Sequence, residues 1–192
     1  IRGGDGVTYL SKPNAGSIPA HVDYLLKDRA AWEEHYKWRY QWSPERVNQG
    51  LLQQLKDTPR DTPLGLHCGS HFGHLRDVIG IVGISYLQMD DQALFREAID
   101  AVGDICYRNA ELALRAGVDF DFAHFWEDIC FKNGPLINPS VFRECVGPHY
   151  KRITDLLNAN GIDIVSLDCD GCIDALVPIW LENGVNTMFP IE

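Results

Sequence analysis

The sequence predicts an α/β fold, a partial (β/α)8 barrel (TIM barrel) with parallel strands. The main observation is a join that occurs three times, at residues 116–120, 160–164 and 183–187, where a helix ends at a glycine and an apolar strand follows at once. Glycine accepts the left-handed conformation that ends a helix, and strands that alternate with helices pair in parallel. The second observation is that no glycine-rich phosphate-binding motif follows any expected strand, which favours the barrel over an open doubly wound sheet.

The first 60 residues predict a hairpin and helices rather than β/α units. Asp5 and Gly6 have turn chemistry and lead into an apolar strand. Residues 12–19 are rich in Pro, Asn, Gly and Ser and predict a loop. Aromatic side chains recur at helical spacing over residues 28–42, where simple packing accounts for them, and residues 48–57 predict a second short helix.

Residues 61–192 predict the β/α units. We expect helices at 92–116 and from Asn138 onward, the second one broken near Gly147 because a proline follows it. The four expected strands are 64–68, 118–126, 162–168 and 186–190. The whole chain, residues 1–192, is expected to form a single barrel domain. A complete barrel takes about 250 residues, so we expect this domain to be a fragment that is incomplete at both ends.

The composition narrows the class of partner. A net charge of −10 argues against nucleic acid, because phosphate binding needs clustered Lys and Arg. No apolar run is long enough to cross a membrane and no signal-peptide pattern is present, so we expect a cytoplasmic protein without a membrane partner. The scattered cysteines fit reduced thiols: Cys68, Cys106, Cys130, Cys145, Cys169 and Cys172. The expected partner is a small molecule. The oligomeric state stays open, although an exposed barrel seam would favour a homodimer.

Carboxylates follow two of the expected strands directly. Asp168 and Asp170 end the strand at 162–168, and Glu127 and Asp128 come just after the strand at 118–126. Because ligands bind beyond the carboxyl ends of parallel strands, we expect these four residues to meet at one rim as catalytic groups. The alternative is structural, since each of them can also cap a helix or pair with a nearby cation.

A smaller set of residues is expected to bind the substrate. Arg76, placed by the pattern in the first turn of a helix after a strand, can hold a carboxylate in a bidentate pair, although such an arginine is more often solvated. His124 and Lys132 lie beside the acidic residues of the second strand, and Glu192 lies beyond the last strand. These four complete the predicted site.

Three histidines after the first strand offer a further alternative. His67, His71 and His74 would place imidazoles near one helical face, which is one arrangement that binds zinc. The spacing matches none of the stricter metal-binding signatures, so this zinc site is the minor alternative.

Several motifs resemble the uroporphyrinogen decarboxylase superfamily. They are Phe-Ala-His-Phe-Trp-Glu-Asp-Ile at 122–129, Lys-Asn-Gly-Pro-Leu-Ile-Asn-Pro at 132–139, Pro-His-Tyr-Lys at 148–151, Leu-Asp-Cys-Asp-Gly at 167–171 and Pro-Ile-Glu at 190–192. The resemblance runs from about Lys27 to the end. It implies a (β/α)8 barrel, and an activity found in that superfamily: decarboxylation of tetrapyrroles or cobalamin-linked methyl transfer that serves corrinoid proteins.

The sequence departs from both activities at specific positions. Arg76 stands where the decarboxylases have an active-site tyrosine, and Asp128 stands where they have a substrate-contacting serine. The strand at 164–168 resembles the one that leads into a His-x-Cys zinc site in the methyltransferase branch, and at that place this chain has Asp168 and Asp170. Two carboxylates are hard ligands, so the implied metal is zinc or another divalent ion such as Mg²⁺ or Mn²⁺.

The sequence therefore leads to three hypotheses. The first is metal-assisted methyl transfer with cobalamin, or a corrinoid protein, as the methyl donor, and with the metal at Asp168 and Asp170. The second is decarboxylation of uroporphyrinogen or a related tetrapyrrole, which needs a proton donor and a cationic cradle made by Arg76, His124 and Lys132. The third is a domain that binds a tetrapyrrole or corrinoid without turnover.

Overall fold

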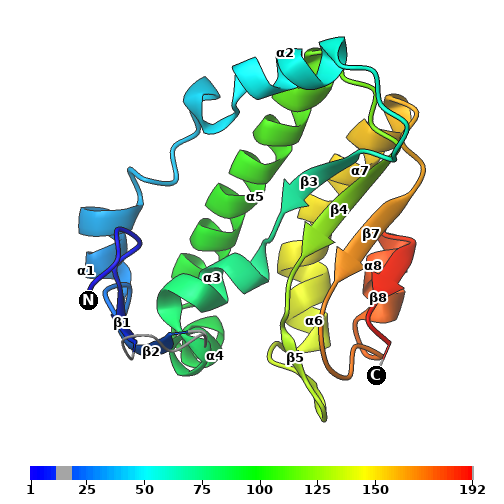
Figure 1. Cartoon of the computed structure of the whole chain (residues 1–192). Coiled ribbons are helices and arrows are strands. Elements are labelled where there is room, and N and C mark those ends of the chain that lie inside the picture. The colour runs from blue at the N-terminus through cyan, green and yellow to red at the C-terminus, as the bar shows by residue number, and fades with distance from the viewer. Residues whose placement is uncertain (12–18, 192) are drawn as a thin grey trace.

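A computed structural model describes residues 1–11 and 19–191 of the chain and contains the predicted parallel sheet (Figure 1). Four strands lie in the order β3-β4-β7-β8, and every neighbouring pair is parallel. Their bounds are β3 Gly65–Gly69, β4 Phe122–Trp126, β7 Val165–Asp168 and β8 Thr187–Phe189. The prediction of an α/β fold with parallel strands, compatible with a partial barrel, is confirmed.

All four strands begin later than the sequence pattern predicts, and the difference is largest for β4 and β7. Residues 118–121 precede β4 as a connection, although Val118 and Phe120 are buried, so their apolar character marks packing rather than strand pairing. Ile164 lies just before β7 and is 54% exposed. Periodicity alone does not separate a buried connection from a strand, because both bury apolar side chains.

The predicted glycine joins are present at all three places. Gly117, Gly161 and Gly184 have φ values of 74°, 80° and 86°, in the region that residues with a Cβ rarely adopt. Each follows the last turn of a helix, so the glycine ends the helix and turns the chain back toward the sheet.

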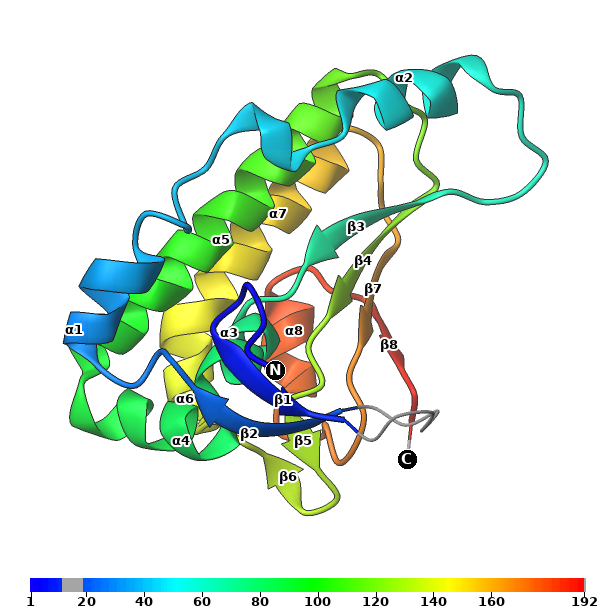
Figure 2. The ribbon, with the colours of Figure 1, turned by 60° about the vertical axis from the view of Figure 1, so that its left-hand side comes forward.

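Helices pack on one face of the sheet (Figures 1 and 2). They are α5 Gln92–Arg115, α7 Gly147–Ala159 and α8 Val177–Glu182. Ala123 and Phe125 of β4 are fully buried, whereas Phe122, His124 and Trp126 alternate with them and are only half-buried. The second face of the sheet therefore carries the side chains that can meet a ligand.

The helix predicted from Asn138 onward is built in three parts. Asn138 caps α6 (Pro139–Val141) by accepting a hydrogen bond from the Ser140 N–H at 2.9 Å. A π-helical turn, η3 (Phe142–Val146), follows, and α7 begins at Gly147 as the predicted break requires.

The segment after β3 holds two helices, of which only the first is predicted. Helix α3 (Phe72–Ile79) ends at Gly80, where φ is 83°, and α4 (Ile81–Asp90) follows directly. Arg76 consequently lies in the last turn of α3 and not in the first turn, which corrects the sequence-based placement.

The N-terminal part is a hairpin followed by short helices. Trp32 and Tyr36 are each 1% exposed, which fits the packing role expected of the aromatic stripe. The predicted loop at 12–19 falls, except for Pro19, outside the described residues. The elements are the antiparallel strands β1 Val7–Leu10 and β2 Ala20–Tyr24, then α1 Arg29–Ala31, the π-helical turn η1 Trp32–Tyr36, the 3-10 turn η2 Pro44–Arg46 and α2 Gln49–Asp57.

Candidate functional site

The two acidic pairs lie at the same end of the sheet. Trp126 at the end of β4 is paired with Asp168 at the end of β7, and the Glu127 N–H donates to the Asp168 carbonyl oxygen at 2.9 Å. The Asp170 N–H donates to Asp128 Oδ1 at 3.2 Å. Parallel pairing thus brings segments about forty residues apart in sequence to one rim.

Glu127 is fully buried beneath this rim, and its side chain accepts hydrogen bonds from backbone N–H groups at the start of α3. Its carboxylate oxygens accept hydrogen bonds from the N–H groups of His71 and Gly73 at 2.7 and 2.6 Å, and from the Tyr150 hydroxyl. Burial raises the pKa of Glu127, and these hydrogen bonds oppose the shift. These contacts match the structural alternative, a helix cap, and the catalytic role of Glu127 stays a prediction.

Asp128 and Arg76 form a compact ionic group beside Glu127. Asp128 has a φ of 56°, which is uncommon for a residue with a Cβ, and the Arg76 guanidinium donates to its carbonyl oxygen. Arg76 also pairs with Asp77 at 2.8 Å, lies 3.8 Å from Asp128 Oδ2 and stacks over the Trp126 ring at 5.4 Å. Two of its donor groups are engaged within the protein, and its role as a substrate ligand stays a prediction.

The remaining predicted ligands lie in different places. His124 is in the middle of β4, with Nδ1 3.0 Å from the Ser166 hydroxyl and its ring stacked on Phe189 at 5.7 Å. Lys132 is exposed between the short strands β5 (Cys130–Phe131) and β6 (Gly134–Pro135). Glu192 lies outside the described residues. Of these three residues, His124 lies on the half-buried face of β4, together with Phe122 and Trp126.

A cavity of about 330 Å³ opens at the ends of β3 and β4. Its size is that of a small-ligand site. The sequence alone does not predict that the residues lining it lie together, because they come from four separate segments. They are Tyr40, Arg46, His67, Gly69, Ser70, His74, Asp77, Val102, Ile105, Cys106 and Trp126.

Two imidazoles in this cavity are kept neutral by their surroundings. Loss of hydration lowers the pKa of His67, and the neighbouring His124 ring, 5.9 Å away, adds to that shift. Burial lowers the pKa of His74, whose Nε2 lies 2.8 Å from the Tyr40 hydroxyl. A neutral imidazole can accept a proton, and both of these rings line the cavity.

The three histidines of the alternative zinc site do not act together. His67 belongs to β3, His74 contacts Tyr40, and His71 is fully buried against Tyr150 with a ring-centre distance of 4.7 Å. Over residues 1–11 and 19–191, no three His, Cys, Asp or Glu side chains are placed to hold a metal ion together. Asp168 and Asp170 offer suitable oxygen donors, and a metal there stays a prediction that needs ligands besides these two.

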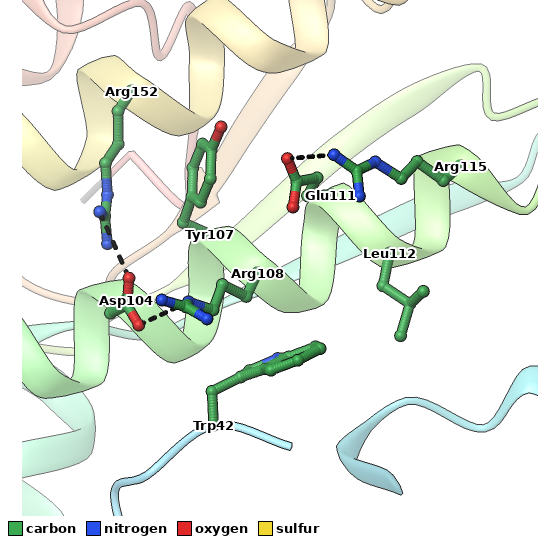
Figure 3. Close-up of a pocket in the computed structure, with 8 residues that line it drawn as sticks. All are labelled: Trp42, Asp104, Tyr107, Arg108, Glu111, Leu112, Arg115 and Arg152. Atoms are coloured by element: carbon green, nitrogen blue, oxygen red, sulfur yellow. Dashed lines mark hydrogen bonds and ion pairs between the residues drawn. The ribbon is translucent and has the colours of Figure 1, made fainter. Parts of the chain in front are cut away.

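A second cavity, of about 440 Å³, lies on the outer side of α5 and is not at the strand ends (Figure 3). Its charged groups are paired with one another. Arg108 contacts Asp104 at 2.8 Å, Arg115 contacts Glu111 at 2.9 Å, and Arg152 lies 3.8 Å from Asp104. Because its lining includes none of the residues at the strand ends, we place the candidate site at the first cavity.

Searches against models of known protein families and against curated proteins returned no match. Among solved structures, the chain is similar to a methyltransferase from Methanosarcina mazei, with 12% sequence identity and a TM-score of 0.59. The match covers 96% of this chain and 52% of the other, so the chain spans about half the length of that protein. At this identity the likeness supports the fold. No helix in the described part of the chain has the length and apolar character to span a membrane.

Proposed function

We propose that this chain contributes to a barrel enzyme that transfers a methyl group from a corrinoid to a small acceptor, with metal assistance. The observation that carries the proposal is the cavity at the ends of β3 and β4, which is lined by His67, a histidine with a lowered pKa, and by Trp126, whose partner in the neighbouring strand is Asp168. The structural likeness to a methyltransferase supports it. The chain spans about half of that protein, so the shared fold alone does not establish the activity.

The side chains suit a thiol or alcohol acceptor. His67 is neutral near pH 7 and takes the acceptor's proton, while Trp126 and Ile105 line the cavity and exclude water. Asp168 and Asp170, together with ligands beyond these two, would hold a divalent cation that supplies Lewis acidity and lowers the acceptor's pKa. Asp128 fixes the loop after β7 through its bond to the Asp170 N–H.

The test is methyl transfer from methylcobalamin to 2-mercaptoethanol, followed by the change in corrinoid absorbance, with metal analysis of the purified protein. The assay uses the natural protein at its full length. We expect transfer that falls at least tenfold in His67→Gln and in Asp168→Asn, and little change in His35→Gln, which does not line the cavity. Absence of both transfer and bound metal would rule the proposal out.

Two alternative functions, decarboxylation and binding without turnover, can be tested with the same protein and variants. Decarboxylation of uroporphyrinogen needs a cationic cradle, but Arg76 is already bound to Asp77 and to the Asp128 turn, which is why methyl transfer is preferred. Consumption of uroporphyrinogen would reverse that preference. A binding domain without turnover would bind corrinoid or tetrapyrrole equally well after Asp168→Ala and Asp170→Ala.

The proposal also extends to partners and location. We propose a cytoplasmic enzyme that receives its methyl group from a corrinoid protein and pairs as a homodimer. Sedimentation of the purified protein, alone and with methylcobalamin-loaded corrinoid protein, measures both associations. A strictly monomeric protein that uses only free methylcobalamin would remove these two partners from the proposal.

A further inference from the structure

The outer cavity on α5, of about 440 Å³, contains more positive than negative side chains (Figure 3). Its lining includes three arginines, Arg108, Arg115 and Arg152, but only two carboxylates, Asp104 and Glu111. The chain as a whole has a net charge of −10, so this balance is opposite to that of the rest of the molecule. A local excess of positive charge attracts a small anion.

Two of these guanidinium groups approach one carboxylate from different helices. Arg108 of α5 contacts Asp104 Oδ2 through Nε at 2.8 Å, whereas Arg152 of α7 lies 3.8 Å from Asp104 Oδ1. The second distance is too long for a hydrogen bond. Asp104 therefore neutralises Arg108 more closely than Arg152, and both guanidinium groups lie within reach of a single small anion.

Arg152 also has donor groups without acceptors. Within the described residues, its Nε and Nη2 atoms are buried and make no hydrogen bond. A buried charged donor that lacks an acceptor costs free energy, which favours an anionic partner. The side chain as a whole is 36% exposed and lines the cavity, so an anion can approach it. Arg108 adds further donors, since in the part of the chain that the structure describes only its Nε contacts a carboxylate.

Aromatic rings hold both guanidinium groups in place. Arg108 lies over the Trp42 ring at 5.6 Å, and Arg152 lies over the Tyr107 ring at 4.9 Å. Trp42 is itself fixed, because its Nε1 donates to Asn109 Oδ1 at 2.9 Å. A stacked guanidinium keeps its N–H edge free for bidentate pairing with phosphate oxygens. The two rings are half-buried and offer the flat apolar surface on which a nucleobase stacks.

We propose that the outer cavity binds a mononucleotide. The phosphate pairs with Arg108 and Arg152, and the base packs against the aromatic rings. Glu111, which contacts Arg115 through Oε1 only, accepts a hydrogen bond from a ribose hydroxyl through its other oxygen, as acidic side chains do in nucleotide sites. The volume of the cavity lies in the range of small-ligand sites. This inference goes beyond the proposed methyl transfer and does not need it, because the lining includes no residue of the strand ends.

The experiment titrates the purified full-length protein with AMP and follows binding by isothermal titration calorimetry. We expect AMP to bind, and adenosine and inorganic phosphate each to bind at least about tenfold more weakly, because each makes only part of the contacts. Arg108→Gln and Arg152→Gln should each weaken AMP binding by a similar factor. The matched control is Arg96→Gln, which should bind AMP normally, since Arg96 also lies on α5 and pairs with a carboxylate but does not line the cavity.

A further variant tests the site without removing a charge. Leu112 lines the cavity, so Leu112→Trp should block AMP binding while methyl transfer stays nearly unchanged, which separates this proposal from the proposed function. No binding of AMP at millimolar concentrations would overturn the proposal. So would adenosine or inorganic phosphate that binds as tightly as AMP, or unchanged AMP binding in both Arg108→Gln and Arg152→Gln. The titrations of the unaltered protein decide the question even if a variant does not fold.

Discussion

At position 127, a carboxylate that the sequence pattern predicts at the rim, as a catalytic or a capping group, is fully buried. The pattern locates the residue correctly at the end of β4, but it does not show which way the side chain points. The structure directs it inward, toward the N–H groups of His71 and Gly73 and the Tyr150 hydroxyl. Its neighbour Asp128 stays at the rim, so adjacent acidic residues take different roles.

Replacing Glu127 tests this structural role. Glu127→Ala leaves two backbone N–H groups and a hydroxyl without an acceptor in a buried site, so we expect a loss of about 3 kcal/mol in the free energy of unfolding. The measurement is urea unfolding followed by circular dichroism. The control is Glu34→Ala, whose side chain is 74% exposed and for which we expect a change within about 0.5 kcal/mol. Equal effects from both substitutions would contradict the assignment.

The buried His71 leads to a prediction about pH. Burial lowers its pKa well below the ordinary value of 6.5, with His149 and Arg152 adding to the shift. The unfolded chain therefore binds a proton that the folded chain does not, and the stability that neutral His71 provides is lost as the pH falls below about 6.5. In His71→Phe the free energy of unfolding should fall less steeply from pH 6.5 to 5, by about 1.4 kcal/mol per pH unit for one proton.

The comparison has an internal control. At pH 8 the histidine is neutral in both the folded and the unfolded chain, so the two proteins differ there only by a constant packing term. Identical slopes between pH 6.5 and 5 would show that His71 binds its proton equally in both states, against the geometry that buries its ring.

Among the secondary-structure elements, helix ends set by a glycine and helix starts set by a capping side chain are predicted best. Gly117, Gly161 and Gly184 locate the helix ends, and Asn138 locates a helix start. The long helix α5 follows from its apolar stripe. The first residues of the strand predicted at 118–126 lie outside β4. Val118 and Phe120 are apolar because they pack in the core, and this made the segment resemble a strand. Local sequence thus fixes where elements end more firmly than it fixes which residues pair.

Gly73 connects the start of α3 to the end of β4. A Cβ there would lie 2.1 Å from the Glu127 carbonyl oxygen, which is backbone and cannot move aside. We expect Gly73→Ala to lower the free energy of unfolding by about 2 kcal/mol or more through overpacking. Gly50→Ala in α2 is the matched helical control. Its Cβ would meet only the Asn48 side chain at 3.4 Å, and we expect a gain of up to about 1 kcal/mol. Thermal or urea unfolding measures both, and a neutral Gly73→Ala would show that the two segments separate easily.

For the whole molecule, the sequence predicts the rim but not the cavity. Parallel strand order is enough to bring Asp168 and Asp170 to the same end as Glu127 and Asp128. The cavity forms where Tyr40, Arg46 and His74 approach β3 and β4, and no local pattern records how these separate segments pack. The signal that was available is His67, a polar residue between the buried Leu66 and Cys68 of β3, which the sequence indicates only as part of a minor zinc alternative.

The two cavities on α5 allow the proposed site to be tested within one helix. Ile105 lines the cavity at the strand ends, and Leu112 lines the one on the outer side of α5. Both are half-buried, so a tryptophan at either position fills its cavity at a similar packing cost. If the acceptor binds at the strand ends, Ile105→Trp should lower kcat/KM for methyl transfer at least tenfold, and Leu112→Trp should leave it nearly unchanged. Matching melting temperatures for the two variants confirm that both are folded. Loss of activity in Leu112→Trp alone would instead move the site to the outer cavity, where paired arginines and not neutral histidines would contact the substrate.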